Sequence, residues 1–165
     1  PWVLSPKRVH KEMEPLKMSF LGIFKSAIII PRGVYEEMIA HAKESYPNEC
    51  CGVIIGTIYK DKRVFEVQRA NNANTERYRD RYIIEPRELN FIYKVARTQG
   101  LDVLGFYHSH PDHPDKPSQT DRELGQPGYS YIIVSVKKGK DVSLRSWIFE
   151  EADGPFKEEK IKVGN

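Results

Sequence analysis

An apolar run that ends in two alternating histidines constrains the fold of this chain more than any other segment. Residues 101–107 are typical of a buried strand, and His108 and His110 follow at its end. Because successive side chains of a strand point to opposite faces, these two imidazoles share one face. A strand end is stiff enough to hold both nitrogens about 2.0–2.1 Å from a zinc ion. The run therefore predicts a sheet strand that carries a candidate metal site.

A third ligand is offered by Asp121, which follows Ser118 in a segment typical of a helix start. The loop 111–117 contains three prolines, which reduce the freedom of the unfolded chain and lower the cost of returning to the site. Two histidines, one carboxylate and an open position form a catalytic zinc pattern, whereas closed four-ligand sets are structural. An isolated His-x-His is more often a pair of ordinary polar residues, and Ser-x-x-Asp is also a common capping box.

Glu49 is the acidic residue whose surroundings best suit a base near such a metal. It stands where a helix ends and a buried strand begins, and that strand could lie beside the strand of His108. A hydrolytic zinc site needs a proton acceptor close to its water. Taken alone, an acidic residue at such a position is more often a solvated loop end.

The complete spacing resembles the signature of a known family. His108, Ser109 and His110 are followed by seven residues, then Ser118, two residues and Asp121. This order is similar, position for position, to the H-S/T-H-x7-S-x2-D signature of the JAMM (MPN+) metallopeptidases. The upstream Glu-Cys-Cys-Gly stretch, residues 49–52, resembles the short prokaryotic branch of that family. The resemblance spans roughly residues 26–149.

The resemblance implies a role for each motif position. His108, His110 and Asp121 would bind zinc, Glu49 would be the general acid/base, and Ser118 would stabilise an oxyanion. No motif position is substituted, which argues against the MPN-minus scaffolds that have lost ligands. The family also implies a partner: a ubiquitin-like or sulfur-carrier protein, cleaved after its C-terminal Gly-Gly tail.

Two other functions remain open at this point. One is a non-catalytic MPN-type binding or scaffold module whose metal is structural or absent. The other is a different zinc hydrolase, such as a nucleobase deaminase, although the H-x-E…P-C-x-x-C pattern of those enzymes is missing.

Composition limits the class of protein and its cellular compartment, but it does not identify the reaction. With 165 residues, 39% hydrophobic and 30% charged, the chain can build one hydrophobic core. A net charge of +3 without a Lys/Arg stripe among aromatics gives little support for nucleic-acid binding. The apolar stretch 19–24 is too short for a membrane span. Adjacent Cys50 and Cys51 cannot staple a fold, which suits a reducing cytoplasm.

The patterns predict an α/β (α+β) fold, a single domain over residues 26–165 with a central mixed sheet flanked by helices. Residues 1–25 are expected to be a loosely ordered N-terminal extension. Expected helices cover 33–46, 86–99 and 118–124, and expected strands cover 26–31, 51–59, 63–70, 81–84, 101–107, 129–136, 141–149 and 156–163.

Several residues near the motif have simple interpretations. Cys50 and Cys51 are expected to pack as small hydrophobes rather than bind zinc. Asp112, His113 and Asp115 in the proline-rich loop are expected to be solvated. Ser109 is expected to pack or to support the site from behind. In similar proteins a region like 71–81 borders the groove for an extended substrate tail, although turn chemistry explains its asparagines equally well.

Overall fold

The computed structural model describes residues 27–151 and 154–164, so the expected N-terminal extension lies outside the described residues and stays a prediction. The described part contains seven strands and three helices. In chain order these are β1 (Ala27–Pro31), α2 (Arg32–Ser45), β2 (Cys51–Ile58), β3 (Lys62–Ala70), α3 (Pro86–Thr98), β4 (Asp102–Pro111), α4 (Gln119–Leu124), β5 (Ser130–Lys137), β6 (Asp141–Ile148) and β7 (Lys157–Gly164).

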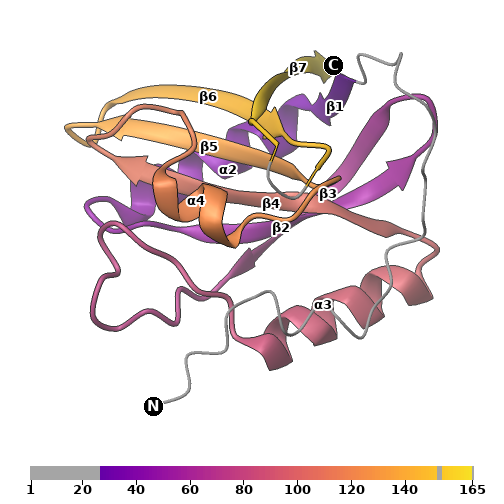
Figure 1. Ribbon diagram of the computed structural model, residues 1–165, viewed down its shortest axis with the longest axis horizontal. Helices are drawn as coiled ribbons and strands as arrows, with labels where there is room; N and C mark the ends of the chain where they lie inside the picture. The colour runs from indigo at the N-terminus through magenta and orange to yellow at the C-terminus, as the bar shows by residue number, and fades with distance from the viewer. Residues whose placement is uncertain (1–26, 152–153, 165) are drawn as a thin grey trace.

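The strands form one mixed sheet, in the order β1-β3-β2-β4-β5-β6-β7, which closes into a barrel through pairing of β7 with β1. The central strand β4 runs antiparallel to β2 and parallel to β5. Figure 1 shows α4 lying in front of β4 and β5, close to the middle of the sheet. The expected mixed sheet is confirmed, and its closure is an addition that the sequence patterns did not predict.

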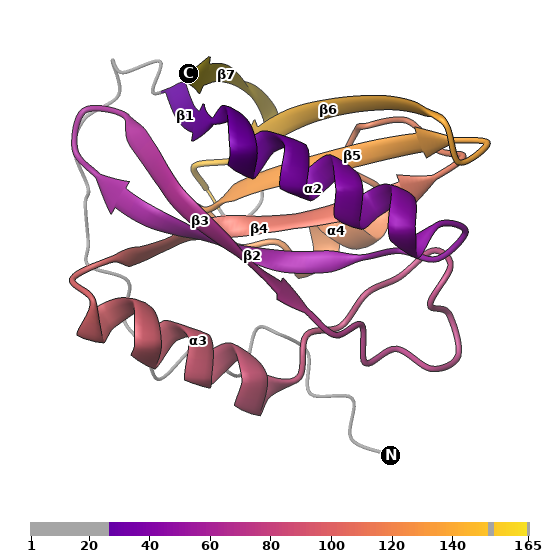
Figure 2. The same cartoon turned by 180° about the vertical axis from the view of Figure 1, so that it is seen from behind.

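Two helices cover opposite faces of the central strands. On β2, Ile54 packs in one apolar cluster with Met38 of α2, while its neighbour Val53 packs in another with Leu89 and Ile92 of α3. Adjacent strand residues point to opposite faces, so the two clusters lie on the two sides of the sheet. Figure 2 shows α2 running across one face, with α3 set apart below β2. In the described part of the chain, no helix combines the length and the apolar composition of a membrane-spanning segment.

The expected strand at residues 81–84 is wrong. This stretch has no regular secondary structure and belongs to the connection between β3 and α3. Its backbone is held by a side chain instead of a neighbouring strand: Asn72 Oδ1 accepts from the Ile83 N–H, and Asn72 Nδ2 donates to the Arg81 carbonyl. A β-branched run predicted a strand, but its backbone is bonded to the Asn72 amide and to the main chain of Ala73, whose N–H donates to the Ile83 carbonyl at 2.8 Å.

Candidate metal centre

The end of β4 brings the two predicted histidines together. His108 Nε2 and His110 Nε2 lie 3.0 Å apart, and the residues are only 1% and 7% exposed. His110 Nδ1 lies 2.7 Å from the Pro114 carbonyl oxygen, which can only accept a hydrogen bond. Nδ1 therefore carries the proton, and Nε2 presents a lone pair to the site. The proline-rich loop thus supports the ring orientation that a metal ligand needs.

The third predicted ligand comes from the start of α4. Ser118 is the N-cap residue, and a capping box joins it to Asp121. Asp121 Oδ1 lies 3.2 Å from His108 Nε2, and Asp121 Oδ2 lies 3.6 Å from His110 Nε2. The cap therefore aims the carboxylate at both imidazoles. A loop and a short helix return the chain to the face of β4 from which the histidines project.

These three side chains fit a zinc ion. His108 Nε2 lies 3.0 Å from His110 Nε2 and 3.2 Å from Asp121 Oδ1, and the 3.6 Å distance from His110 Nε2 is to the other carboxylate oxygen, Oδ2. One donor atom from each residue lies within 4.8 Å of the others. Tetrahedral ligands at about 2.0–2.1 Å from zinc would be about 3.3–3.4 Å from one another. Among the described residues, they are the one cluster of His, Cys, Asp or Glu with donors grouped closely enough to hold a cation. Two nitrogens and one carboxylate leave one tetrahedral position for another ligand.

The electrostatics of the cluster favour a bound cation. Burial opposes the charge on Asp121, but His108, His110 and Ser118 outweigh it and hold the pKa of this carboxyl well below its usual range. Burial also opposes a charge on His110, yet the Asp121 carboxylate and the Pro114 carbonyl raise the pKa of that ring. Negative charge is therefore concentrated where the three donors meet.

Glu49 lies beside this cluster because β2 pairs with β4. In that pairing Cys51 faces His108, so Glu49 precedes the strand at the level of the histidines. Glu49 is 7% exposed. Burial is the main cause that raises the pKa of its carboxyl to about 8; His110 acts against this shift and Asp121 adds to it. A carboxyl whose pKa lies near neutrality can both take up and release a proton, as acid–base catalysis requires.

Ser109, between the two histidines, links the Glu49 segment to β4. Its Oγ accepts a hydrogen bond from the Cys50 N–H at 2.8 Å, and its own N–H donates to the Cys50 carbonyl at 3.0 Å. The side chain is fully buried. Ser109 thus extends the β2–β4 pairing by one residue, which matches the supporting role expected for it.

A cavity joins the candidate base to the metal donors. Glu49, His110, Ser118 and Asp121 line it together with an apolar wall. That wall is contributed by the 81–84 stretch, the start of α3, β4, β5 and the end of α4, through Tyr82, Ile83, Ile84, Pro86, Leu89, Phe106, Leu124 and Tyr131. These four polar side chains therefore face a space large enough to admit part of another molecule, next to surface that would favour an apolar group.

Tyr82 is a site residue that sequence reasoning missed. Its ring stacks on His108, with ring centroids 4.7 Å apart and planes at 28°. His108 is thereby covered on one side, and it does not line the cavity. The signal was present as an apolar Tyr-Ile-Ile stretch at 82–84 after a polar loop, but that stretch was interpreted as a strand.

The two cysteines were expected to pack in the interior, and the polar residues of the proline-rich loop were expected to be solvated. Cys50 and Cys51 are buried free thiols, and neither belongs to the donor cluster, in line with packing roles. Asp112 and His113 are exposed, as expected. The expectation for Asp115 is wrong: it is only 6% exposed. Its charge is balanced by an ion pair of 3.4 Å with Arg145 of β6.

The fold and site can now be compared with known proteins. Residues 31–149 match the family model described as prokaryotic homologs of the JAB domain. The chain belongs to this family. The resemblance to JAMM (MPN+) proteins that the motif indicated is therefore confirmed at the level of the family.

Relatives of this prokaryotic JAB protein include named peptidases. It is 35% identical over 105 residues to a desampylase of Haloferax volcanii, covering 61% of this chain and 74% of the relative. It is 28% identical over 137 residues to the CysO-cysteine peptidase of Mycobacterium tuberculosis, covering 82% and 90%. A solved structure of a Desulfitobacterium hafniense protein is 33% identical, with a TM-score of 0.73 and coverage of 83% of this chain and 92% of that one.

Proposed function

We propose that this protein is a zinc-dependent peptidase or isopeptidase. Its reaction is hydrolysis of the amide bond after the C-terminal Gly-Gly tail of a ubiquitin-like or sulfur-carrier protein. The observation that carries the proposal is the cavity that Glu49 shares with His110 and Asp121, two members of the His108–His110–Asp121 donor cluster. The relatives named desampylase and CysO-cysteine peptidase support the substrate class.

Each side chain has a task in this reaction. Zinc held by His108, His110 and Asp121 would supply Lewis acidity, which makes water more acidic and polarises a carbonyl group. Glu49 accepts a proton from the attacking water and passes it to the leaving amine as the carbon–nitrogen bond breaks. No covalent bond between enzyme and substrate is needed, so Ser109 keeps its supporting place between the strands.

Ser118 is the proposed donor to the developing oxyanion. In this structure its hydroxyl donates to Asp121 Oδ2 at 2.5 Å. A hydroxyl rotates to suit its partner, so the same group can turn to a substrate oxygen. Stabilisation of charge that forms only in the transition state is among the largest single contributions to catalysis.

The family resemblance supplies the Gly-Gly substrate class, and the geometry of glycine is compatible with the buried site. Glycine has no Cβ, so its backbone can approach a buried centre closely. The candidate metal site is such a centre, since both histidines are buried.

We place the activity in the cytoplasm, where reducing conditions suit the two free cysteines.

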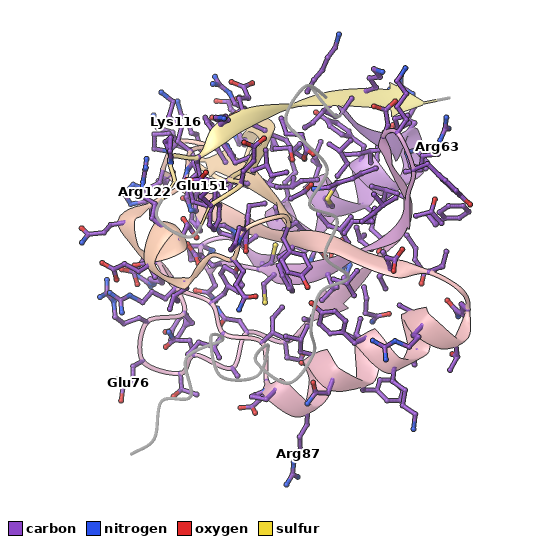
Figure 3. The ribbon with its side chains drawn as sticks, turned by 45° about the vertical axis from the view of Figure 1, so that its right-hand side comes forward. Arg63, Glu76, Arg87, Lys116, Arg122 and Glu151 are labelled. Atoms are coloured by element: carbon purple, nitrogen blue, oxygen red, sulfur yellow. The ribbon has the colours of Figure 1, made fainter. Side chains whose placement is uncertain are left out.

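The test combines metal analysis with an assay on conjugates of a Gly-Gly-tailed carrier protein. Glu49→Gln removes the proton carrier but keeps the size of the side chain, so we expect full zinc content and loss of cleavage. Glu76→Gln is the matched control, because Glu76 is exposed on the 71–85 loop and points away from the molecule (Figure 3). The control is expected to retain both zinc and activity.

A further variant and two contradicting outcomes complete this experiment. Asp121→Ala should lower zinc content, and an unchanged metal load would mean that the third ligand is another residue. Cleavage by Glu49→Gln at the wild-type rate would remove Glu49 from its role. A zinc-loaded wild type that cleaves no conjugate would favour the non-catalytic scaffold instead.

A further inference from the structure

One asparagine holds together the loop between β3 and α3, residues 71–85. Asn72 Nδ2 donates to the Arg81 carbonyl at 2.9 Å. Asn72 Oδ1 accepts from the N–H of Ile83 at 3.1 Å and of Asn74 at 3.0 Å. The amide therefore joins the start of the loop to its end, next to a backbone bond of 2.8 Å from the Ala73 N–H to the Ile83 carbonyl. Asn72 is half-buried, so loss of its amide would leave backbone groups without these partners.

The same loop holds the main chain of Glu49. The Glu49 N–H donates to the Tyr78 carbonyl at 2.9 Å, in the middle of the loop. The Glu49 carbonyl accepts a longer bond of 3.4 Å from Asn72 Nδ2. Both polar groups of the Glu49 backbone thus end on the loop that Asn72 organises.

The next residue along the chain is held from a different side. The Cys50 N–H donates to Ser109 Oγ, which belongs to the metal-bearing strand. Glu49 therefore lies between a support on β4 and a support on the loop. Because the loop also lines the cavity through Asp80, Arg81 and Tyr82, substrate in the cavity and the proton carrier would share one support.

We propose that Asn72 is a positioning residue that acts through Glu49. Its amide sets the shape of the 71–85 loop, and the loop sets the direction from which the Glu49 carboxyl enters the site. This inference rests on the proposed function, in which Glu49 carries the proton. Misplacement of a catalytic group by about 1 Å can cost about 100-fold in rate, so a support of this kind has a measurable effect.

Asn72→Ala tests the proposal, and Asn74→Ala is its matched control. Asn74 lies in the same loop and also accepts backbone bonds, from the N–H of Glu76 at 3.2 Å and of Arg77 at 2.9 Å, without a bond to Glu49. We expect Asn72→Ala to lower kcat by about 10- to 100-fold with unchanged zinc content. Asn74→Ala should retain kcat. Equal losses in the two variants would overturn the proposal, because general disorder of the loop would then explain them.

A double variant separates positioning from a merely structural role. If Asn72 acts through Glu49, Asn72→Ala should cause no further loss in the residual rate of Glu49→Gln, since the group being positioned is already gone. A full additional loss of the same size in that background would overturn the proposal.

Amide hydrogen exchange supplies a readout that needs no activity. We expect Asn72→Ala to speed exchange of the Glu49 N–H by about tenfold or more, and Asn74→Ala to leave it unchanged. In the wild type, the Glu49 and Ile83 amides should open together, because one loop covers both; independent openings would overturn the proposal even if Asn72→Ala fails to fold. Faster Glu49 exchange in a protein whose wild type cleaves nothing would refute the proposed function while leaving the positioning intact.

Discussion

At the scale of single residues, Ser118 and Asp121 show how one short pattern serves two purposes. The Ser118 Oγ accepts the Asp121 N–H at 3.1 Å, and the Asp121 carboxylate accepts the Ser118 N–H at 2.7 Å. These reciprocal bonds are a capping box, which satisfies donors at a helix start. The same bonds direct the carboxylate toward the histidines. The helix-cap and metal-ligand interpretations of Ser-x-x-Asp are therefore compatible.

Ser118→Ala should separate these two purposes. Loss of the proposed oxyanion donor is expected to lower kcat by about 100- to 1000-fold in fully zinc-loaded protein. Loss of the cap should lower the free energy of unfolding by only about 1 kcal/mol. Steady-state kinetics and urea unfolding measure the two effects on the same sample. Wild-type kcat in the zinc-loaded variant would contradict the assigned donor.

At the scale of elements, the close approach of β4 and β5 holds the histidines in place. The two strands are parallel, and Gly105 pairs with Ser130 at the start of their ladder. A Cβ on Gly105 would lie 1.9 Å from the Ser130 carbonyl oxygen. Only glycine fits there, since real Cβ atoms do not approach backbone oxygen so closely. His108 and His110 lie farther along the same ladder, so a shift at Gly105 would move both.

Gly105→Ala should therefore affect stability and the metal site together. We expect the free energy of unfolding to fall by about 1–3 kcal/mol, as in overpacked interiors, and zinc affinity to fall with it. Gly33→Ala in α2 is the control, because a Cβ there would meet nothing within 4 Å. That change should stabilise the protein by up to about 1 kcal/mol. Chemical unfolding and chelator competition give both quantities, and equal effects of the two changes would contradict this account.

At the scale of the whole molecule, a buried ion pair links strands across the barrel. Lys62 of β3 lies 3.6 Å from Glu159 of β7, and their side chains are 7% and 0% exposed. Lys62 Nζ also donates to Ser130 Oγ of β5 at 2.7 Å, and Ser146 Oγ of β6 donates to Glu159 Oε2 at 2.7 Å. Side chains of four strands thus meet in one network, which favours a single arrangement of the closed sheet.

Removing one partner of this ion pair should lower the free energy of unfolding more than replacing both partners with apolar residues. Glu159→Ala leaves the Lys62 charge buried without its partner, so the free energy of unfolding should fall by about 3–5 kcal/mol. Lys62→Met combined with Glu159→Leu removes both charges and fills the space, and should recover most of the loss. Urea unfolding of the two variants decides the point. A double variant less stable than Glu159→Ala would show that the network contributes more than its desolvation cost.

Local sequence patterns predicted most helices and strands, but they failed where a contact with another part of the chain determines the structure. Residues 81–84 have the composition of a strand, but their backbone is bonded to the Asn72 side chain and to the Ala73 main chain of the same loop rather than to another strand. Asp115 has the surroundings of a solvated loop residue, yet Arg145, thirty positions away, makes its burial possible. Neither partner can be identified from neighbouring residues, because side-chain pairing depends on which elements pack together.

The sequence by itself determined the local chemistry of the candidate site. Alternation along β4 places two imidazoles on one face, and the Ser-x-x-Asp spacing forms the cap that aims the carboxylate. Such geometry depends on a few neighbouring dihedral angles, so spacing is enough to specify it. Only the tertiary structure decided that β2 lies against β4 and that Glu49 reaches the site from that side. It also decided that Asn72 bonds to the Glu49 backbone and that Tyr82 stacks on His108. Strand pairing and burial are collective, because each contact becomes favourable only when many distant segments have already come together.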